Sequence, residues 1–202
     1  MGNWTLAVLG AIVASLAVAL GVYAVERLRR FVLFALIVMA IGLDLTVACA
    51  GVGIPGPGNV LVVLAAVPLG VWISSLLRDR QALLAVLVTA AVIDVAAGFG
   101  DSLVLQAARS SPTDPVRLLV VCVPWHEELV APVSLVDLVV LSLVFATVRR
   151  FGAPRLTVWL LSVAGLVVAL GLERTLGAHV SRVPFLAVCG LIGSSLPVVE
   201  DE

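Results

Sequence analysis

The stretch QALLAVLVTAAVIDVAAGFG, residues 81–100, decides the fold, and Asp94 is the one charged side chain within it. Twenty residues of α-helix extend about 30 Å, which matches the hydrocarbon thickness of a bilayer. The apolar residues follow one another without the alternation that a transmembrane β-strand shows. The stretch therefore predicts a membrane-spanning helix that carries a carboxyl group.

The rest of the chain has the same apolar character. Of its 202 residues, 62% are hydrophobic and 12% are charged, and the mean hydropathy is +1.22. A soluble domain carries about 25% charged residues because its surface faces water. We therefore expect an all-α fold, a polytopic transmembrane helical bundle of about seven spans, near residues 4–25, 31–52, 60–77, 81–100, 129–148, 155–172 and 183–198.

We expect one integral membrane domain over residues 1–202, with an N-terminal three-helix part at 1–80 and a second helical part at 81–198. The net charge of −1 provides no basic surface for nucleic acid, so no such partner is expected. The cysteines match no metal-binding or redox spacing and are expected to be apolar packing residues: Cys49, Cys122 and Cys189.

All twelve basic residues are arginines, and they fall between the apolar runs. Loops that face the cytoplasm are enriched in arginine and lysine. An N-terminus outside the membrane and a cytoplasmic C-terminus would place eight of the twelve on the inner side: Arg27, Arg29, Arg30, Arg78, Arg80, Arg149, Arg150 and Arg155. We therefore expect that orientation.

Three acidic residues lie inside apolar segments: Asp44, Asp94 and Asp137. A carboxylate at the bilayer centre costs about 2.5–3.5 kcal/mol on insertion scales, and we expect no arginine within the spans as an adjacent partner. One explanation is a protonated acid that is hydrogen-bonded between helices. The other is a functional site.

Asp94 and Asp137 sit at similar depths. Asp94 lies six residues before the end of its span and Asp137 eight residues after the start of the next. Adjacent helices would bring the two carboxyls side by side, where they would share a proton. Such a pair activates water for attack on a peptide carbonyl, with one carboxylate as base and one protonated carboxyl as acid. Asp44 reaches a similar depth, so its sequence neighbours must decide.

Motifs around Asp94 and Asp137 distinguish these two aspartates from Asp44. Ile93-Asp94 resembles the Tyr-Asp pair of the presenilin and signal-peptide-peptidase family, especially its short archaeal and bacterial members. The segment 134–137, Ser-Leu-Val-Asp, stands in the place of the family's Gly-x-Gly-Asp motif, after an apolar segment at 116–124 that ends in proline. Pro184-Phe185-Leu186 is similar to its Pro-Ala-Leu motif. The resemblance covers residues 81–195, about half of the chain.

This resemblance implies an intramembrane aspartyl protease of a prokaryotic cell membrane that cleaves transmembrane peptide or protein substrates. Asp94 and Asp137 would be catalytic, and four residues would contact the substrate: Val136, Pro184, Phe185 and Leu186. No metal and no cofactor is expected. Val136 replaces a glycine of the family motif, so we expect its branched side chain to crowd a passing substrate strand and slow cleavage.

Two other classes of function remain open. One is a catalytically inactive, presenilin-like homologue or membrane scaffold. The other is a proton- or cation-coupled transporter that uses the buried aspartates, although the sequence contains no evident inverted repeat. Dependence on both aspartates together with peptide products would indicate the protease, whereas ion-coupled flux would indicate the transporter.

Two further motifs resemble those of other membrane proteases, but their surroundings do not fit. Gly98-Phe99-Gly100-Asp101 is a literal Gly-x-Gly-Asp, and with Asp44 it would suggest an enzyme similar to prepilin peptidases. Asp101 lies at a span end without the following basic residue, so we expect a helix cap there. Glu127-Glu128 resembles a motif of membrane CAAX proteases, but Pro132 stands where its arginine is expected. His126 and His179 are expected to be loop residues.

Overall fold

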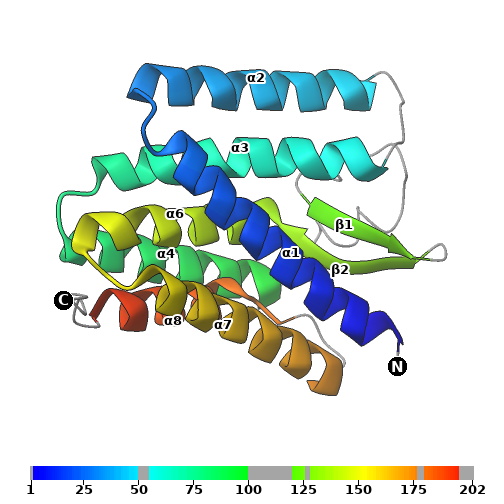
Figure 1. Ribbon diagram of the computed structural model, residues 1–202. Coiled ribbons are helices and arrows are strands. Elements are labelled where there is room, and N and C mark those ends of the chain that lie inside the picture. Colours follow the sequence, from blue (N-terminus) through cyan, green and yellow to red (C-terminus); the bar gives the residue numbers. More distant parts are fainter. Residues whose placement is uncertain (1, 50–54, 100–119, 126–127, 177–179, 196–202) are drawn as a thin grey trace.

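The computed structural model describes residues 2–49, 55–99, 120–125, 128–176 and 180–195 (Figure 1). The elements in these ranges are α1 (Gly2–Val25), α2 (Arg30–Cys49), α3 (Pro55–Leu76), α4 (Arg80–Phe99), β1 (Val120–Trp125), β2 (Glu128–Ser134), α6 (Leu135–Phe151), α7 (Arg155–Leu176) and α8 (Val183–Ser195).

Helices make up the body of the molecule, which confirms the helical class (Figure 1). Among the described residues, two helices are long and apolar enough to cross a membrane, Trp4–Val25 within α1 and Arg155–Leu176. Four shorter apolar helices accompany them: Arg30–Leu43, Val60–Leu76, Leu135–Thr147 and Val183–Gly193. Consecutive helices run in opposite directions, so the ends that carry the α1–α2, α3–α4 and α6–α7 connections lie together (Figure 1).

The predicted span at 129–148 is wrong in its first part. Residues 128–134 form β2, which pairs antiparallel with β1 from Val120 opposite Ser134 to Trp125 opposite Glu128. Pro132 lacks a backbone N–H and disfavours helix for the residue before it, and the neighbouring valines favour extended backbone. The helix α6 therefore begins only at Leu135.

The helices are arranged around α3 and α8. The helix α2 packs on the outer side of α3, whose other neighbours are α1 and α6, and α8 contacts α4, α6 and α7. A Cβ placed on Gly190 would lie 2.7 Å from Val144 Cγ2 of α6 and 3.6 Å from Leu87 Cδ1 of α4. Because this glycine lacks a side chain, α8 fits between α4 and α6.

A second close approach joins α3 to α6. The Ser142 hydroxyl donates to the Val67 carbonyl over 2.9 Å, and a Cβ on Gly70 would lie 2.6 Å from Ser142 Cβ and 2.8 Å from the Leu143 backbone nitrogen. Such contacts between small residues are typical of helix packing in membranes, where close backbone approach replaces the hydrophobic driving force.

At the end of the bundle opposite β1 and β2, two arginines donate hydrogen bonds to the last turn of α3. Arg30 donates to the Ser75 carbonyl over 2.8 Å and Arg150 to the Ser74 carbonyl over 2.9 Å. Both carbonyls belong to the last turn of α3, where backbone acceptors lack partners within the helix. Asp79 caps the start of α4 by accepting from the Ala82 N–H over 2.7 Å.

We predict that Gly70→Ala lowers the free energy of unfolding by about 1–3 kcal/mol, because the added methyl overlaps backbone and cannot be relieved by a rotamer change. The matched control is Gly171→Ala in α7, where a Cβ meets nothing within 4 Å. The control should be neutral or slightly stabilising, since alanine favours helix by up to about 1 kcal/mol. Thermal unfolding in detergent measures both, and equal midpoints would contradict the packing.

Candidate aspartate site

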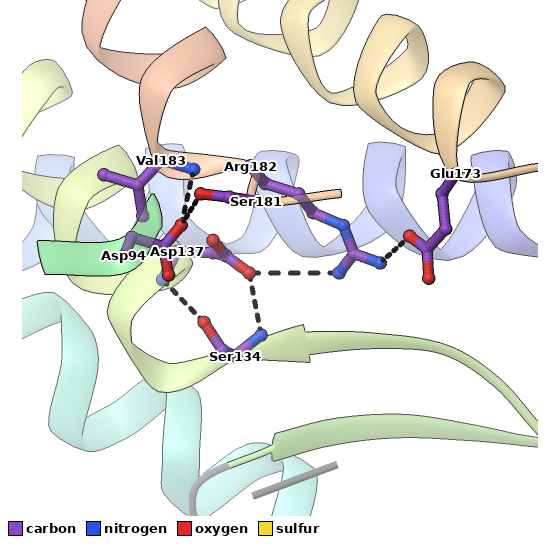
Figure 2. A network of polar contacts seen from close by, with 7 residues as sticks. All are labelled: Asp94, Ser134, Asp137, Glu173, Ser181, Arg182 and Val183. Atoms are coloured by element: carbon purple, nitrogen blue, oxygen red, sulfur yellow. Dashed lines mark hydrogen bonds and ion pairs between the residues drawn. The ribbon is translucent and has the colours of Figure 1, made fainter. Parts of the chain in front are cut away.

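Three consecutive residues at the entrance to α8 bind both predicted aspartates (Figure 2). The Ser181 hydroxyl and the Val183 N–H both donate to Asp94 Oδ2, the second over 3.3 Å. Between these residues, Arg182 Nη1 lies 3.9 Å from Asp137 Oδ2. The segment 181–183 therefore joins the carboxyl of α4 to the carboxyl of α6.

Asp137 lies in the first turn of α6, where it forms a capping box with Ser134. The Ser134 N–H donates to Asp137 Oδ2 over 2.9 Å, and the Asp137 N–H donates to the Ser134 hydroxyl over 3.1 Å. Each side chain thereby satisfies a backbone donor that the helix leaves open. This reciprocal pair starts α6 and fixes the orientation of the Asp137 carboxyl, which is buried.

A buried arginine completes the network (Figure 2). Arg182 is 3% exposed, and its Nη2 lies 3.0 Å from Glu173 Oε2 of α7. The guanidinium thus bridges Glu173 and Asp137. We expected no arginine within the spans beside the aspartates. The arginine that pairs with Asp137 directly precedes the predicted span at 183–198, and its long side chain reaches Asp137 from the start of α8.

Asp94 and Asp137 come from two helices, α4 and α6, that both pack on α8. The two carboxyls are near enough for the charge of one to act on the other (Figure 2). Asp94 is partly exposed and its neighbour Ile93 is 63% exposed, whereas Asp137 is buried.

The other predicted substrate contacts surround this pair in part. Pro184 and Phe185 are partly buried in the first turn of α8, whereas Leu186 is 1% exposed and belongs to the core. Val136 is 49% exposed beside Asp137, on the outer side of α6. Leu186 is therefore a core residue, whereas the Val136 side chain lies on the surface of the bundle.

The helix α2, which carries Asp44, packs on the side of α3 away from α6 (Figure 1). Glu128 begins β2, at the tip of the pair of strands. The other motif residues that were set aside lie outside the described residues: Asp101, His126, Glu127 and His179. Within the described part of the chain, no group of three or more His, Cys, Asp or Glu side chains could hold a metal ion.

The residues that bind the aspartates were not among those predicted from the sequence. Ser134 had a recognisable signal, since Ser-x-x-Asp before an apolar run is the spacing of a capping box. Ser181 and Arg182 directly precede Pro184, but their partners are 87 and 45 residues away, on other helices. No local pattern reveals such pairs.

Comparisons with known proteins leave the resemblance without outside support: no protein-family model, no curated protein and no solved structure matches the chain. The presenilin likeness therefore rests on the sequence motifs alone.

We predict that Arg182→Gln destabilises the fold by about 3–5 kcal/mol, because a carboxylate is then left buried without its partner. Adding Asp137→Asn to that variant should recover part of the loss, since the unpaired charge is removed. The control is Arg174→Gln, at an exposed position of α7. A double-mutant cycle of unfolding free energies measures the coupling, and strictly additive losses would contradict an Arg182–Asp137 interaction.

Proposed function

We propose that this chain is an intramembrane aspartyl protease that cleaves transmembrane helical substrates with Asp94 and Asp137. The observation that carries the proposal is the 181–183 segment, which contacts both carboxyls directly ahead of Pro184-Phe185-Leu186. Three segments that are separate in sequence and that resemble three motifs of one family thus converge on one place. An incidental pair of buried acids would not require that convergence.

The proposal includes a bilayer around the helices. Large apolar side chains are exposed along them, among them Phe31 at 81%, Met39 at 68%, Val13 at 64% and Leu156 at 68%. A soluble protein rarely exposes large contiguous apolar patches, whereas lipid tails solvate such a surface. The eight arginines that surround the loops at one end suit the cytoplasmic face.

This placement puts the aspartates inside the membrane. The helix α8 has 13 residues and therefore extends about 20 Å, less than the roughly 30 Å of hydrocarbon. Its far end points toward the arginine-rich end of the bundle (Figure 1). The 181–183 segment then lies below the opposite surface of the membrane, at a depth where a substrate helix would be cleaved within the bilayer.

The two carboxyls would divide the steps of hydrolysis between them. The ionised one takes a proton from water as the water oxygen attacks the peptide carbonyl carbon, and the protonated one gives its proton to the carbonyl oxygen. When the carbon–nitrogen bond breaks, the first carboxyl gives its proton to the amine and the second regains its own.

One observation favours the non-catalytic homologue as a second candidate. Asp137 already caps α6 and pairs with Arg182, and these contacts alone would account for a buried carboxylate. A transporter has less support, since the charged groups extend across one end of the bundle from α4 to α7 and do not follow the helices from end to end.

We predict that Asp94→Asn and Asp137→Asn each abolish cleavage of transmembrane peptides by the purified protein in liposomes, because one carboxyl cannot serve as both acid and base. Asp79→Asn is the matched control, since it alters an exposed aspartate and asparagine caps a helix equally well. Mass spectrometry of the products, with and without a transition-state inhibitor of aspartyl proteases, provides the measurement.

Activity that persists in either asparagine variant would remove the aspartyl mechanism. A wild-type protein that folds, yet cleaves no peptide of the panel, would favour the non-catalytic homologue.

We predict the orientation from single cysteines placed at opposite ends of the bundle in a background without the native ones. Thr175→Cys, at the end of α7, should react with a membrane-impermeant maleimide on intact cells. Gln81→Cys, at the arginine-rich end, should react only after permeabilisation. Both positions are exposed and uncharged. The opposite pattern of labelling would reverse the orientation.

A further inference from the structure

A groove of about 410 Å³ lies on the far side of α6 from α4, between α1, α6 and α7. Its volume falls within the roughly 300–1,000 Å³ of small-molecule sites. Leu16, Phe145 and Trp159 line its apolar part, and Tyr23, Glu26 and Arg155 line its mouth. None of these residues belongs to the aspartate site.

The polarity of the groove changes along the helices. Arg155 begins α7, and Tyr23 lies in the last turn of α1, so both are at the arginine-rich end. Trp159 lies one turn further into α7, and Leu16 lies about two turns before Tyr23, or about 10 Å deeper. Charged groups thus stand at the membrane surface and apolar ones at the depth of the acyl chains.

The mouth also presents donors that suit a phosphate. The Arg155 guanidinium lies over the Tyr23 ring at 6.0 Å from its centroid and supplies a planar set of N–H donors at the mouth. The neighbouring Glu26 carboxylate would repel a purely anionic head group but complements one that carries an ammonium beside its phosphate. Phosphoethanolamine has this pair of charges.

We propose that this groove is a binding site for one phosphatidylethanolamine molecule, with its phosphate at Arg155 and an acyl chain against Leu16, Phe145 and Trp159. The inference rests on the membrane placement but not on proteolysis. A lipid held here would fill the groove and contact α1, α6 and α7. The helices α1 and α7 also contact each other directly. Such a molecule would be a structural component of the bundle.

The test titrates the purified full chain in a neutral detergent with dioleoyl phosphatidylethanolamine, or with dioleoyl glycerol, which has the same chains and no phosphate. Native mass spectrometry measures the bound fraction. We expect the phospholipid to bind at least about tenfold more tightly, because charge-assisted hydrogen bonds to phosphate are the strong ones. Equal binding of the two lipids would overturn the proposal.

Two variants localise the site. Arg155→Gln should remove the preference for the phospholipid, and Leu16→Trp should weaken both lipids by filling the groove. The control is Arg29→Gln, at an exposed position of the same end of the bundle and outside the groove, which should bind as the wild type does. Unchanged binding in both groove variants would overturn the proposal. Because Asp94 and Asp137 are untouched, loss of lipid binding and loss of proteolysis are separable results.

Discussion

A buried guanidinium that bridges two carboxylates is the interaction on which the candidate site depends. Arg182 joins Glu173 of α7 to Asp137 of α6 from the start of α8, so one side chain ties three helices together. A charge at this depth is tolerable only when it is paired, and each partner therefore restricts the others. The same short segment holds Asp94 of α4 through Ser181 and Val183. The position of α8 thereby determines the relative position of both aspartates.

Small residues allow this arrangement. Gly190 lets α8 enter between α4 and α6, and Gly70 lets α3 approach the backbone of α6. In a bilayer, burial of apolar surface contributes little to the association of helices, so close packing and polar contacts must stabilise it. The glycines allow the close packing, and the Arg182 network supplies the polar contacts. The apolar side chains that remain exposed would provide the surface for lipid in the proposed membrane placement.

The sequence predicts some of these features and not others, for physical reasons. Continuous apolar runs predict the helices, and the isolated aspartates within them stand out in the sequence, because both signals are local. The strand β2 was not predicted because the short segment around Pro132 is as apolar as a helix, and periodicity alone does not separate the two. The pairing of Arg182 with Asp137 and the place of α8 between α4 and α6 depend on contacts between distant segments, which no local pattern contains.

The asymmetry of the two carboxyls links the fold to the proposed chemistry. An aspartyl dyad needs one ionised and one protonated carboxyl, and a symmetric pair leaves the choice between them open. Here Asp137 faces a guanidinium and a backbone N–H, whereas the hydrogen-bonding groups at Asp94 are a hydroxyl and a backbone N–H. Of the two carboxyls, only Asp137 has a guanidinium beside it, so the two are not equivalent. The non-catalytic homologue would share this asymmetry, since neutralising Asp137 serves stability as well. The two candidate functions therefore differ at Asp94, which is partly exposed: the proposed protease requires that water and a peptide carbonyl reach this carboxyl, whereas a purely structural pair does not.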